Sequence, residues 1–310
     1  MKISPYINIK RIEFIVTYHC TGKCMHCSVG DMLNYCKGGH HVLGEAAAEL
    51  VRRLKDMFPV TSVMTFGGEP LLYADDVCAI HSAAREAGIP ARQLITNGFF
   101  SRNAVTIGSV AEKLAEAGVN DLLLSVDAFH QQHIPVEPVY YFAEAAKKCG
   151  LNVRLSPAWV VNRDHDDPYN KRTRELLEHF ELLGIPTGSG NDIFMAGNAI
   201  KNLSEYYPAP KLDMAEKCGS MPYTAPLTEV DTITIVPNGD VEVCSFAIGN
   251  IYHEKIEDII ARYDPFADAT MRAVMEGAEA MLELAGKRGI AVDTSKCYSV
   301  CDICRQLNLK

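Results

Sequence analysis

The chain has 310 residues, 48% of them hydrophobic, and a net charge of −9 with an isoelectric point near 5.6. This length and apolar content suffice for one large folded domain, or for a domain with a smaller appended region. The acidic balance and the lack of a dense Lys/Arg cluster argue against a phosphate-binding surface, so we expect no nucleic-acid partner.

The start of the chain and its cysteines indicate the compartment. Residues 1–10 lack the charged-then-apolar pattern of a signal sequence, and no apolar run approaches membrane-spanning length, so we expect no membrane association. Eleven cysteines in such a chain point to metal or redox chemistry rather than to disulfides. We therefore predict a cytoplasmic protein.

The first predicted strand covers residues 12–17 and is followed by Cys20, Cys24 and Cys27 in the spacing C-x3-C-x2-C. Three thiolates can hold three irons of a 4Fe–4S cluster and leave the fourth iron open to a reacting ligand. The spacing differs from that of zinc ribbons and of ferredoxins. The alternative is a set of buried or zinc-binding cysteines.

A helix is predicted over residues 44–57, and a second strand over residues 60–66 runs directly into Gly67-Gly68-Glu69-Pro70. Alone, that segment would indicate only a turn. The alternation then continues with strands 93–96, 121–126, 152–156 and 192–195 and helices 75–87, 104–117, 139–148 and 171–183.

Strands that alternate with glycine-terminated helices indicate right-handed βαβ units around a parallel sheet. Six such units are too few to close an eight-stranded barrel. We therefore expect an α/β fold in the form of an open partial (βα)6 TIM-like barrel over residues 1–205. Its functional residues should lie at the carboxyl ends of the strands.

The pattern changes after residue 206. Residues 232–244 read as a β-hairpin, in which Asn238-Gly239 suits a type I′ turn. Two helices are predicted near residues 255–263 and 268–287. Residues 206–310 thus form a second, smaller α+β region, and its end carries Cys297, Cys301 and Cys304.

The cysteine triplet after the first strand, together with Gly-Gly-Glu-Pro after the second, resembles the radical S-adenosylmethionine (radical SAM) superfamily. The resemblance implies that S-adenosylmethionine binds the open iron of the Cys20, Cys24 and Cys27 cluster. One-electron cleavage would yield a 5′-deoxyadenosyl radical that abstracts a hydrogen from substrate. It also implies a flavodoxin- or ferredoxin-type electron donor, and the oxygen sensitivity of such clusters suggests an anaerobic host.

The resemblance also assigns S-adenosylmethionine contacts to residues at the strand ends. His26 would pack near the adenine, Glu69 would accept a hydrogen bond from the methionine ammonium, and Ser125 and Asp127 would contact the ribose. The full expected set is His26, Gly67, Gly68, Glu69, Asn97, Ser125, Asp127 and Arg154. Alternatives remain open: His26 as a surface residue, Asn97-Gly98 as an ordinary turn, and Arg154 in a structural salt bridge.

Other residues are candidates for steps beyond cofactor binding. Cys36 could return a hydrogen atom to a substrate radical, or it could be an ordinary loop cysteine. His130 could act as an acid or base, or be merely hydrogen-bonded. The segment Met195-Ala-Gly-Asn-Ala199 resembles a sixth-strand segment that touches adenine.

The last region resembles the SPASM and Twitch extensions, which hold an auxiliary 4Fe–4S cluster. In the shorter Twitch form, the ligands of this second cluster would be Cys218, Cys244, Cys301 and Cys304. Cys297 would then be spare. A zinc site is the alternative.

The overall layout most resembles small enzymes that mature ribosomally synthesised peptides (RiPP), with a peptide-epimerase-like arrangement. A peptide substrate is therefore expected. Crosslinking is favoured over epimerisation, because Ser245 stands where a hydrogen-donating thiol could be. The alternatives are a small-molecule enzyme, such as a cofactor-biosynthetic cyclase, and an iron–sulfur electron carrier, which would not need Gly67-Gly68-Glu69-Pro70.

Overall fold

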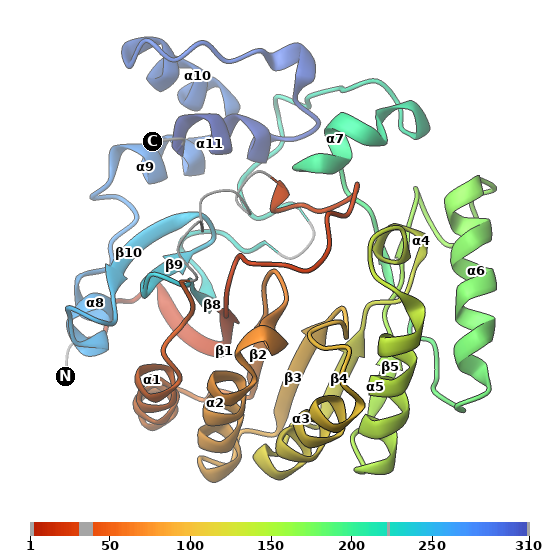
Figure 1. Ribbon diagram of the computed structural model, residues 1–310. Helices are drawn as coiled ribbons and strands as arrows, with labels where there is room; N and C mark the ends of the chain where they lie inside the picture. Colours follow the sequence, from red (N-terminus) through yellow and green to blue (C-terminus); the bar gives the residue numbers. More distant parts are fainter. Residues whose placement is uncertain (1–2, 31–39, 222–223, 309–310) are drawn as a thin grey trace.

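The computed structural model describes residues 3–30, 40–221 and 224–308, and its centre is an eight-stranded sheet in the order β10-β9-β8-β1-β2-β3-β4-β5. Strands β1 to β5 are parallel neighbours in chain order (Figure 1). The predicted α/β class is confirmed. These strands are β1 Ile7–Ile15, β2 Ser62–Phe66, β3 Ala91–Thr96, β4 Asp121–Leu124 and β5 Val153–Leu155.

The helices that return the chain between strands match their predicted positions. They are α1 Gly44–Met57, α2 Ala74–Glu86, α3 Ala104–Ala117, α5 Val136–Lys148 and α6 Pro168–Glu181. Local capping explains the boundaries: Asn103 accepts hydrogen bonds from the first turn of α3, and Gly118 ends that helix at a φ of 86°.

Side chains of β1 alternate between the two sides of the sheet. Ile12 and Phe14 are fully buried in the core that includes residues of α1 and α2, whereas Arg11 and Glu13 are only partly buried. We call the side that carries Arg11 and Glu13, opposite the helix-covered core, the open face.

The sixth strand differs from the prediction. Strand β7, Asn191–Asp192, pairs with β6, Ala158–Trp159, in a separate two-stranded sheet. Only an isolated bridge between Leu155 and Thr187 links this segment to β5 in the described part of the chain. Pro186 and the nearby glycines explain the short pairing, because proline cannot donate to a ladder and glycine weakens a strand.

The C-terminal region extends the same sheet. Strand β8, Val230–Ile235, lies parallel to β1, and β9, Asp240–Val243, and β10, Phe246–Asn250, follow as antiparallel neighbours. The predicted hairpin is confirmed, but its turn type is wrong: among Asn238 and Gly239 only the glycine has a positive φ. Because β8 and β1 share a sheet and a core, the division at residue 205/206 stays a prediction.

The remaining α-helices complete the described part of the fold. They are α4 Ala128–Gln131, α7 Asn198–Asn202, α8 Ile256–Arg262, α9 Ala269–Glu276, α10 Ala278–Lys287 and α11 Val300–Asn308. The single helix predicted over residues 268–287 is two helices, because Gly277 adopts a φ of 114° between them. Figure 1 shows α7 and α9 to α11 gathered at the top, away from α1, α2 and α3. No helix in the described part of the chain has the length and apolar character to cross a membrane.

Candidate active site

The first three cysteines lie in the loop that follows β1. A Cβ atom added at Gly22 would lie 3.3 Å from Cys24 Sγ and 3.8 Å from Cys20 Sγ, so both sulfurs face this glycine. Burial is the main reason that the pKa of Cys20 rises to about 11, and the charges of Glu69 and Cys27 add to it. Thiolates in this loop therefore need a positive partner, and the donor set fits an iron–sulfur cluster.

At least two of these three sulfurs lie more than 4.8 Å apart, which is too far for both to bind one zinc ion. Two thiolates on one zinc ion, each about 2.3 Å from it, cannot be more than about 4.6 Å apart. Within the described residues, the one set of three potential ligand atoms lying within 4.8 Å of one another is His26, Asp127 and His130, not the cysteines. The geometry therefore favours a cluster over the zinc alternative at Cys20, Cys24 and Cys27.

Gly67 and Gly68 hold the cysteine loop by its backbone. The Gly68 amide donates to Thr17 O at 2.7 Å, and the Glu69 amide donates to His19 O at 2.8 Å. A Cβ at Gly68 would lie 2.2 Å from His19 O, and one at Gly67 2.4 Å from Thr17 O. Only glycine permits this approach. Both glycines were predicted to contact S-adenosylmethionine. In the structure, their lack of a side chain lets the backbone of residues 17–19 approach closely.

Glu69 is buried at this junction and keeps part of its hydrogen-bonding capacity. Its carboxylate accepts from Leu71 N at 2.9 Å, Thr96 Oγ1 at 2.7 Å and Asn97 N at 2.9 Å. A carboxylate has about four acceptor positions, so one is left. Burial raises the pKa of Glu69 to about 7, and a bound cation would favour its charged form. The predicted contact with an ammonium group is therefore chemically available.

Asn97 also supports the cysteine loop. It is buried, its Nδ2 lies 3.6 Å from Cys20 Sγ and donates to Thr21 Oγ1 at 3.2 Å, and its Oδ1 accepts from Phe99 N at 2.8 Å. Asn97 is thus more than a turn residue: it connects the end of β3 to the first cluster cysteine.

The opposite side of the loop is held by residues that sequence reasoning missed. Asn198 donates its amide to Cys27 O at 3.0 Å and its Nδ2 to Cys24 O at 3.3 Å, and Asn202 Nδ2 donates to Met25 O at 3.1 Å. A Cβ at Gly197 would lie 2.4 Å from Ser28 O. The sequence singled out residues 195–199 for a contact with adenine, but it did not predict that this segment holds the cysteine loop by hydrogen bonds.

The carboxylate of Asp127 is hydrogen-bonded to other groups of the protein. Its carboxylate accepts from Phe129 N, His130 N, Ala158 N and His130 Nδ1 at 2.8 to 3.0 Å, and the residue is fully buried. All acceptor positions are used, so this geometry does not support the predicted ribose contact. Ser125 fits that role better, because it is buried at the end of β4 and no described residue bonds to its hydroxyl.

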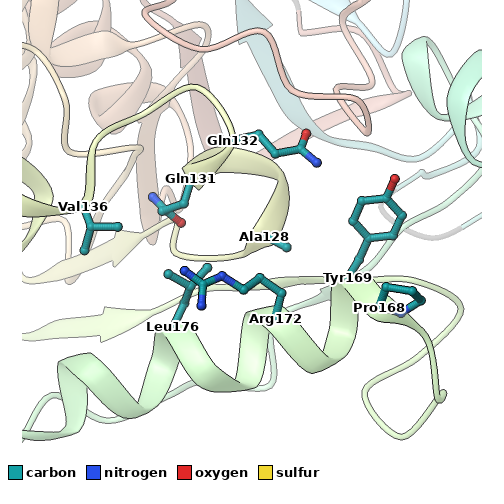
Figure 2. Close-up of a pocket in the computed structure, with 8 residues that line it drawn as sticks. All are labelled: Ala128, Gln131, Gln132, Val136, Pro168, Tyr169, Arg172 and Leu176. Carbon is teal, nitrogen blue, oxygen red and sulfur yellow. The ribbon is translucent and has the colours of Figure 1, made fainter.

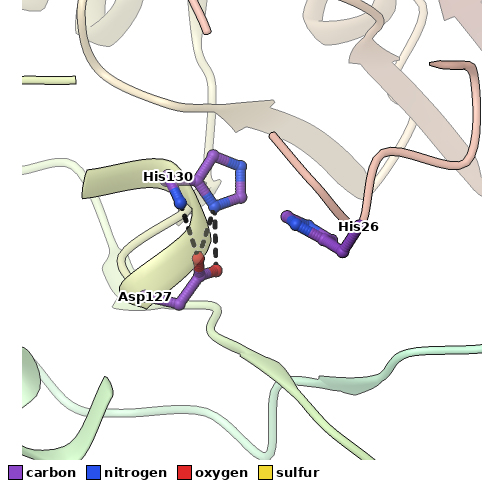
Figure 3. Close-up of side chains that lie close together, drawn as sticks. All are labelled: His26, Asp127 and His130. Carbon is purple, nitrogen blue, oxygen red and sulfur yellow. Dashed lines mark hydrogen bonds and ion pairs between the residues drawn. The ribbon is translucent and has the colours of Figure 1, made fainter. Parts of the chain in front are cut away.

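His26 and His130 lie close to Asp127, as Figure 3 shows. The His26 ring lies 4.9 Å from Phe129 and 5.1 Å from His130, and its Nδ1 is buried without a partner in the described chain. Burial lowers the pKa of His26 to about 4. His26 is therefore packed inside the site rather than at the surface. Its contact with adenine stays a prediction.

The bond from His130 to Asp127 fixes the orientation of the imidazole. Burial alone would lower the pKa of His130, but the charge and hydrogen bond of Asp127 raise it. Burial would also raise the pKa of Asp127, yet His130 lowers it. The three groups are close enough to share an ion, but the lone pairs of Asp127 are already used.

Arg154 has a structural partner. Its guanidinium donates to both oxygens of Asp121, at 2.8 and 3.0 Å, on the open face of the sheet. Asp121 also accepts from Gln93 at 2.7 Å. This bidentate pair is the alternative left open by the sequence, and the predicted contact of Arg154 with S-adenosylmethionine would require breaking it. Cys36 lies outside the described residues.

The auxiliary cysteines also come together. The pKa of Cys218 rises to about 11 and that of Cys304 to about 12, first through burial and then through the charges of neighbouring cysteines, Cys244 and Cys301 among them. Cys301 and Cys304 lie one turn apart on α11, which the sequence did not predict as a helix. The charges that act on Cys297, which is 1% exposed, come from Asp302, Asp293 and Arg305 rather than from these four cysteines. The assignment of Cys297 as the spare cysteine stays a prediction.

A surface cavity of about 310 Å³ lies between α4 and α6 (Figure 2). Its lining includes Ala128, Gln131, Tyr169 and Arg172. None of the predicted site residues lines it, although Tyr169 stacks on Phe129 at 4.8 Å and so contacts the wall behind His26. Tyr169 also contacts the cysteine loop, since its hydroxyl lies 3.9 Å from Met25 Sδ, so the cavity lies next to that loop.

Comparison with known proteins agrees with the geometry. Residues 14–156 match the family model described as Radical SAM superfamily, and this segment runs from the end of β1 through β5 and carries both motifs. The chain therefore contains a radical SAM domain, and the fold of this domain implies S-adenosylmethionine and one 4Fe–4S cluster.

Two curated relatives are GTP 3′,8-cyclases. The protein from Mycobacterium marinum is 33% identical over 119 residues, which is 38% of this chain and 31% of that protein. The protein from Moorella thermoacetica is 23% identical over 217 residues, 64% of each chain. The chain thus spans about a third of the length of the first relative. A solved structure of histidine-tagged anSMEcpe with bound AdoMet has a TM-score of 0.52 at 13% identity, covering 97% of this chain and 99% of that one, so the fold is shared.

Proposed function

We propose that the chain is a radical SAM oxidoreductase that acts on a small polar molecule and carries a second, auxiliary 4Fe–4S cluster. The observation that supports the first part is the cysteine loop clamped from both sides, by Gly68 and Glu69 and by Asn198. Cys20, Cys24 and Cys27 would hold the first cluster. When bound, the cluster and S-adenosylmethionine supply a hydrogen-abstracting radical.

The residues of this chain position those groups. Glu69 has one acceptor position that no described residue uses, and this position suits the methionine ammonium. Ser125, directly after β4, has a hydroxyl that bonds to no described residue and suits the ribose. His26 and Phe129 form a ring-lined wall beside Cys24. Glu69, Ser125 and Phe129 are buried and His26 is partly buried, so together they exclude water from the place where a reactive intermediate would form.

The second cluster is supported by the meeting of Cys218, Cys244, Cys301 and Cys304. Cys244 lies in the two-residue turn between β9 and β10 and has a φ of 56°. Residues other than glycine rarely adopt this backbone conformation. Strained backbone of this kind is commonly kept for function. As with the first site, these sulfurs are not within 4.8 Å of one another in threes, which favours a cluster over zinc.

A small-molecule substrate is favoured by the relatives, which are named GTP 3′,8-cyclases. GTP itself fits poorly on the open face. Arg11 is paired with Glu13 at 2.6 Å and Arg154 with Asp121 at 2.8 Å, so a triphosphate would have to displace carboxylates to reach these arginines. We therefore propose a polar substrate without a triphosphate.

The peptide substrate expected from the sequence stays a prediction, and none of the relatives named above supports it. Co-expression with a candidate precursor peptide and mass spectrometry would test it. A product two mass units lighter indicates a crosslink, and an unchanged mass with deuterium uptake from heavy water indicates epimerisation.

The cleavage of S-adenosylmethionine tests the central proposal. Anaerobically reconstituted protein with a reductant should release 5′-deoxyadenosine and methionine, even slowly without substrate. The Cys20→Ala/Cys24→Ala/Cys27→Ala variant should release none, whereas a Cys78→Ala/Cys149→Ala control should behave as wild type. A wild-type protein with an intact cluster and no release would overturn the assignment.

A further inference from the structure

The turn that follows β4 places an imidazole at the cysteine loop with one nitrogen uncommitted. His130 Nδ1 lies 2.8 Å from Asp127 Oδ2, and its side chain keeps 16% exposure. No described residue bonds to its Nε2. The segment that continues from α4 contacts the loop, since a Cβ at Gly22 would lie 3.3 Å from Ile134 Cδ1.

From this geometry we propose that His130 is the proton donor of the active site and that Asp127 is its positioning residue. This assignment rests on the proposed function, because it places the acceptor on the substrate. Asp127 holds Nδ1 as the hydrogen-bond donor, which leaves Nε2–H directed away from the carboxylate. The arrangement of a buried carboxylate, an imidazole and a reacting atom is a recurrent way to orient a catalytic histidine.

The step transfers one proton and no electrons. The Nε2–H bond of the imidazolium breaks as a new bond forms from that hydrogen to a substrate oxygen or nitrogen that is gaining negative charge. The neutral imidazole keeps its Nδ1–H bond to Asp127. It regains a proton at Nε2 from solvent before the next turnover.

The groups around His130 explain why it, and not His26, takes this role. Asp127 faces it from its own turn, Glu69 acts on it through its charge from the segment after β2, and the ring of His26 lies 5.1 Å away on the cysteine loop. Two carboxylates therefore favour a protonated His130. His26 sits against Phe129, and its Nδ1 has no hydrogen-bond partner in the described chain.

Nitrogen NMR of the reconstituted holoprotein labelled with ¹⁵N-histidine tests the proposal without any substrate. The His130 signals would be assigned by their loss in His130→Gln. We expect Nδ1 to stay protonated from pH 5 to 9 while only Nε2 titrates. A His130 that titrates at Nδ1, or that mixes both neutral tautomers, would overturn the dyad.

Substitution of Asp127 tests whether it positions the His130 imidazole or only caps α4. Asp127→Asn keeps a carbonyl oxygen for the helix cap but removes the charge, so the His130 midpoint should fall and the tautomer preference should be lost. His133→Gln, three residues further on at an exposed position, should change neither. An unchanged His130 in Asp127→Asn would contradict the proposal. If that variant does not fold, the wild-type titration alone still decides.

S-adenosylmethionine added to the unreduced holoprotein locates His130 relative to the site. Its signals should shift on binding, while those of His179 on α6 should not. Binding measured by equilibrium dialysis with no shift of His130 would remove it from the site. Failure to release 5′-deoxyadenosine on reduction would instead defeat the proposed function, so the two failures are distinguishable.

Discussion

The two cysteine-rich ends of the chain share the spacing C-x3-C-x2-C but fold it differently. In residues 20–27 all three cysteines lie in one loop, clamped by backbone bonds from both sides. In residues 297–304 the first cysteine turns away into the core, and the other two lie on a helix and meet Cys218 and Cys244. A shared spacing therefore does not define a shared site. The elements that carry the cysteines decide which sulfurs converge.

The largest expected effect separates the two regions by iron content. Reconstituted wild-type protein should bind about eight irons, since each 4Fe–4S cluster contributes four. Both the Cys20→Ala/Cys24→Ala/Cys27→Ala variant and the Cys301→Ala/Cys304→Ala variant should bind about four. Iron analysis with absorption spectroscopy measures this. One zinc and about four irons in the wild type would refute the auxiliary cluster.

The comparison also shows how far the sequence could be read. Cys20, Cys24 and Cys27 follow a strand with a clear apolar pattern, and Gly67 follows another, so both strand ends could be located from local pattern alone. The pairing of β8 with β1 could not, because strand partners distant in sequence leave no local signal. The same limit hid the way α11 brings Cys304 to Cys244. The helix itself was missed although Val300, Ile303, Cys304 and Leu307 have helical spacing, which is a local signal.

The roles of Asp127 and Arg154 were harder to predict for a related reason. Both stand at positions where the resemblance implies ligand contacts. Whether a carboxylate or guanidinium is free depends on which neighbours it meets in the fold. The Asp127 carboxylate accepts hydrogen bonds from the first turn of α4 and from the Ala158 amide, and the Arg154 guanidinium donates to Asp121. Such competition between protein and ligand partners is not visible in a motif.

A second prediction tests the clamp on the first loop. Gly68→Ala would place a Cβ 2.2 Å from His19 O, against backbone that cannot move aside easily. We expect a loss of about 2–4 kcal/mol in the free energy of unfolding, and iron content near that of the cysteine triple variant. Anaerobic chemical denaturation and iron analysis measure both effects.

The control for this variant is Gly108→Ala, inside α3, where an added Cβ meets nothing within 4 Å. Alanine there should stabilise the helix by about 0.5–1 kcal/mol and leave the iron content unchanged. A Gly68→Ala protein that keeps wild-type stability and iron would show that the clamp is not needed.

A third prediction concerns the spare cysteine. Cys297 is buried, its Sγ lies 3.5 Å from Asp293 O, and Gln306 Nε2 lies 3.7 Å from that sulfur. Cys297→Ala should leave about eight irons bound but lower the free energy of unfolding by about 1 kcal/mol, through the lost packing. Loss of about four irons would instead identify Cys297 as a ligand. All three cysteines of the C-x3-C-x2-C spacing would then bind a cluster in both regions.

The smallest expected effect tests whether the second region stores strain for its ligand. Cys244 has a φ of 56° in the turn between β9 and β10. A residue with a Cβ pays about 1–2 kcal/mol in this conformation, and glycine does not. In iron-free protein, Cys244→Gly should therefore be more stable than Cys244→Ala by about 1 kcal/mol, although both lack the sulfur. At Ser245, the next residue, φ is not positive, so the order should reverse because glycine only adds flexibility to the unfolded chain. Urea denaturation of the four variants measures the two differences. If alanine equals glycine at position 244, the turn is unstrained without its metal, and the positive φ carries no information about ligation.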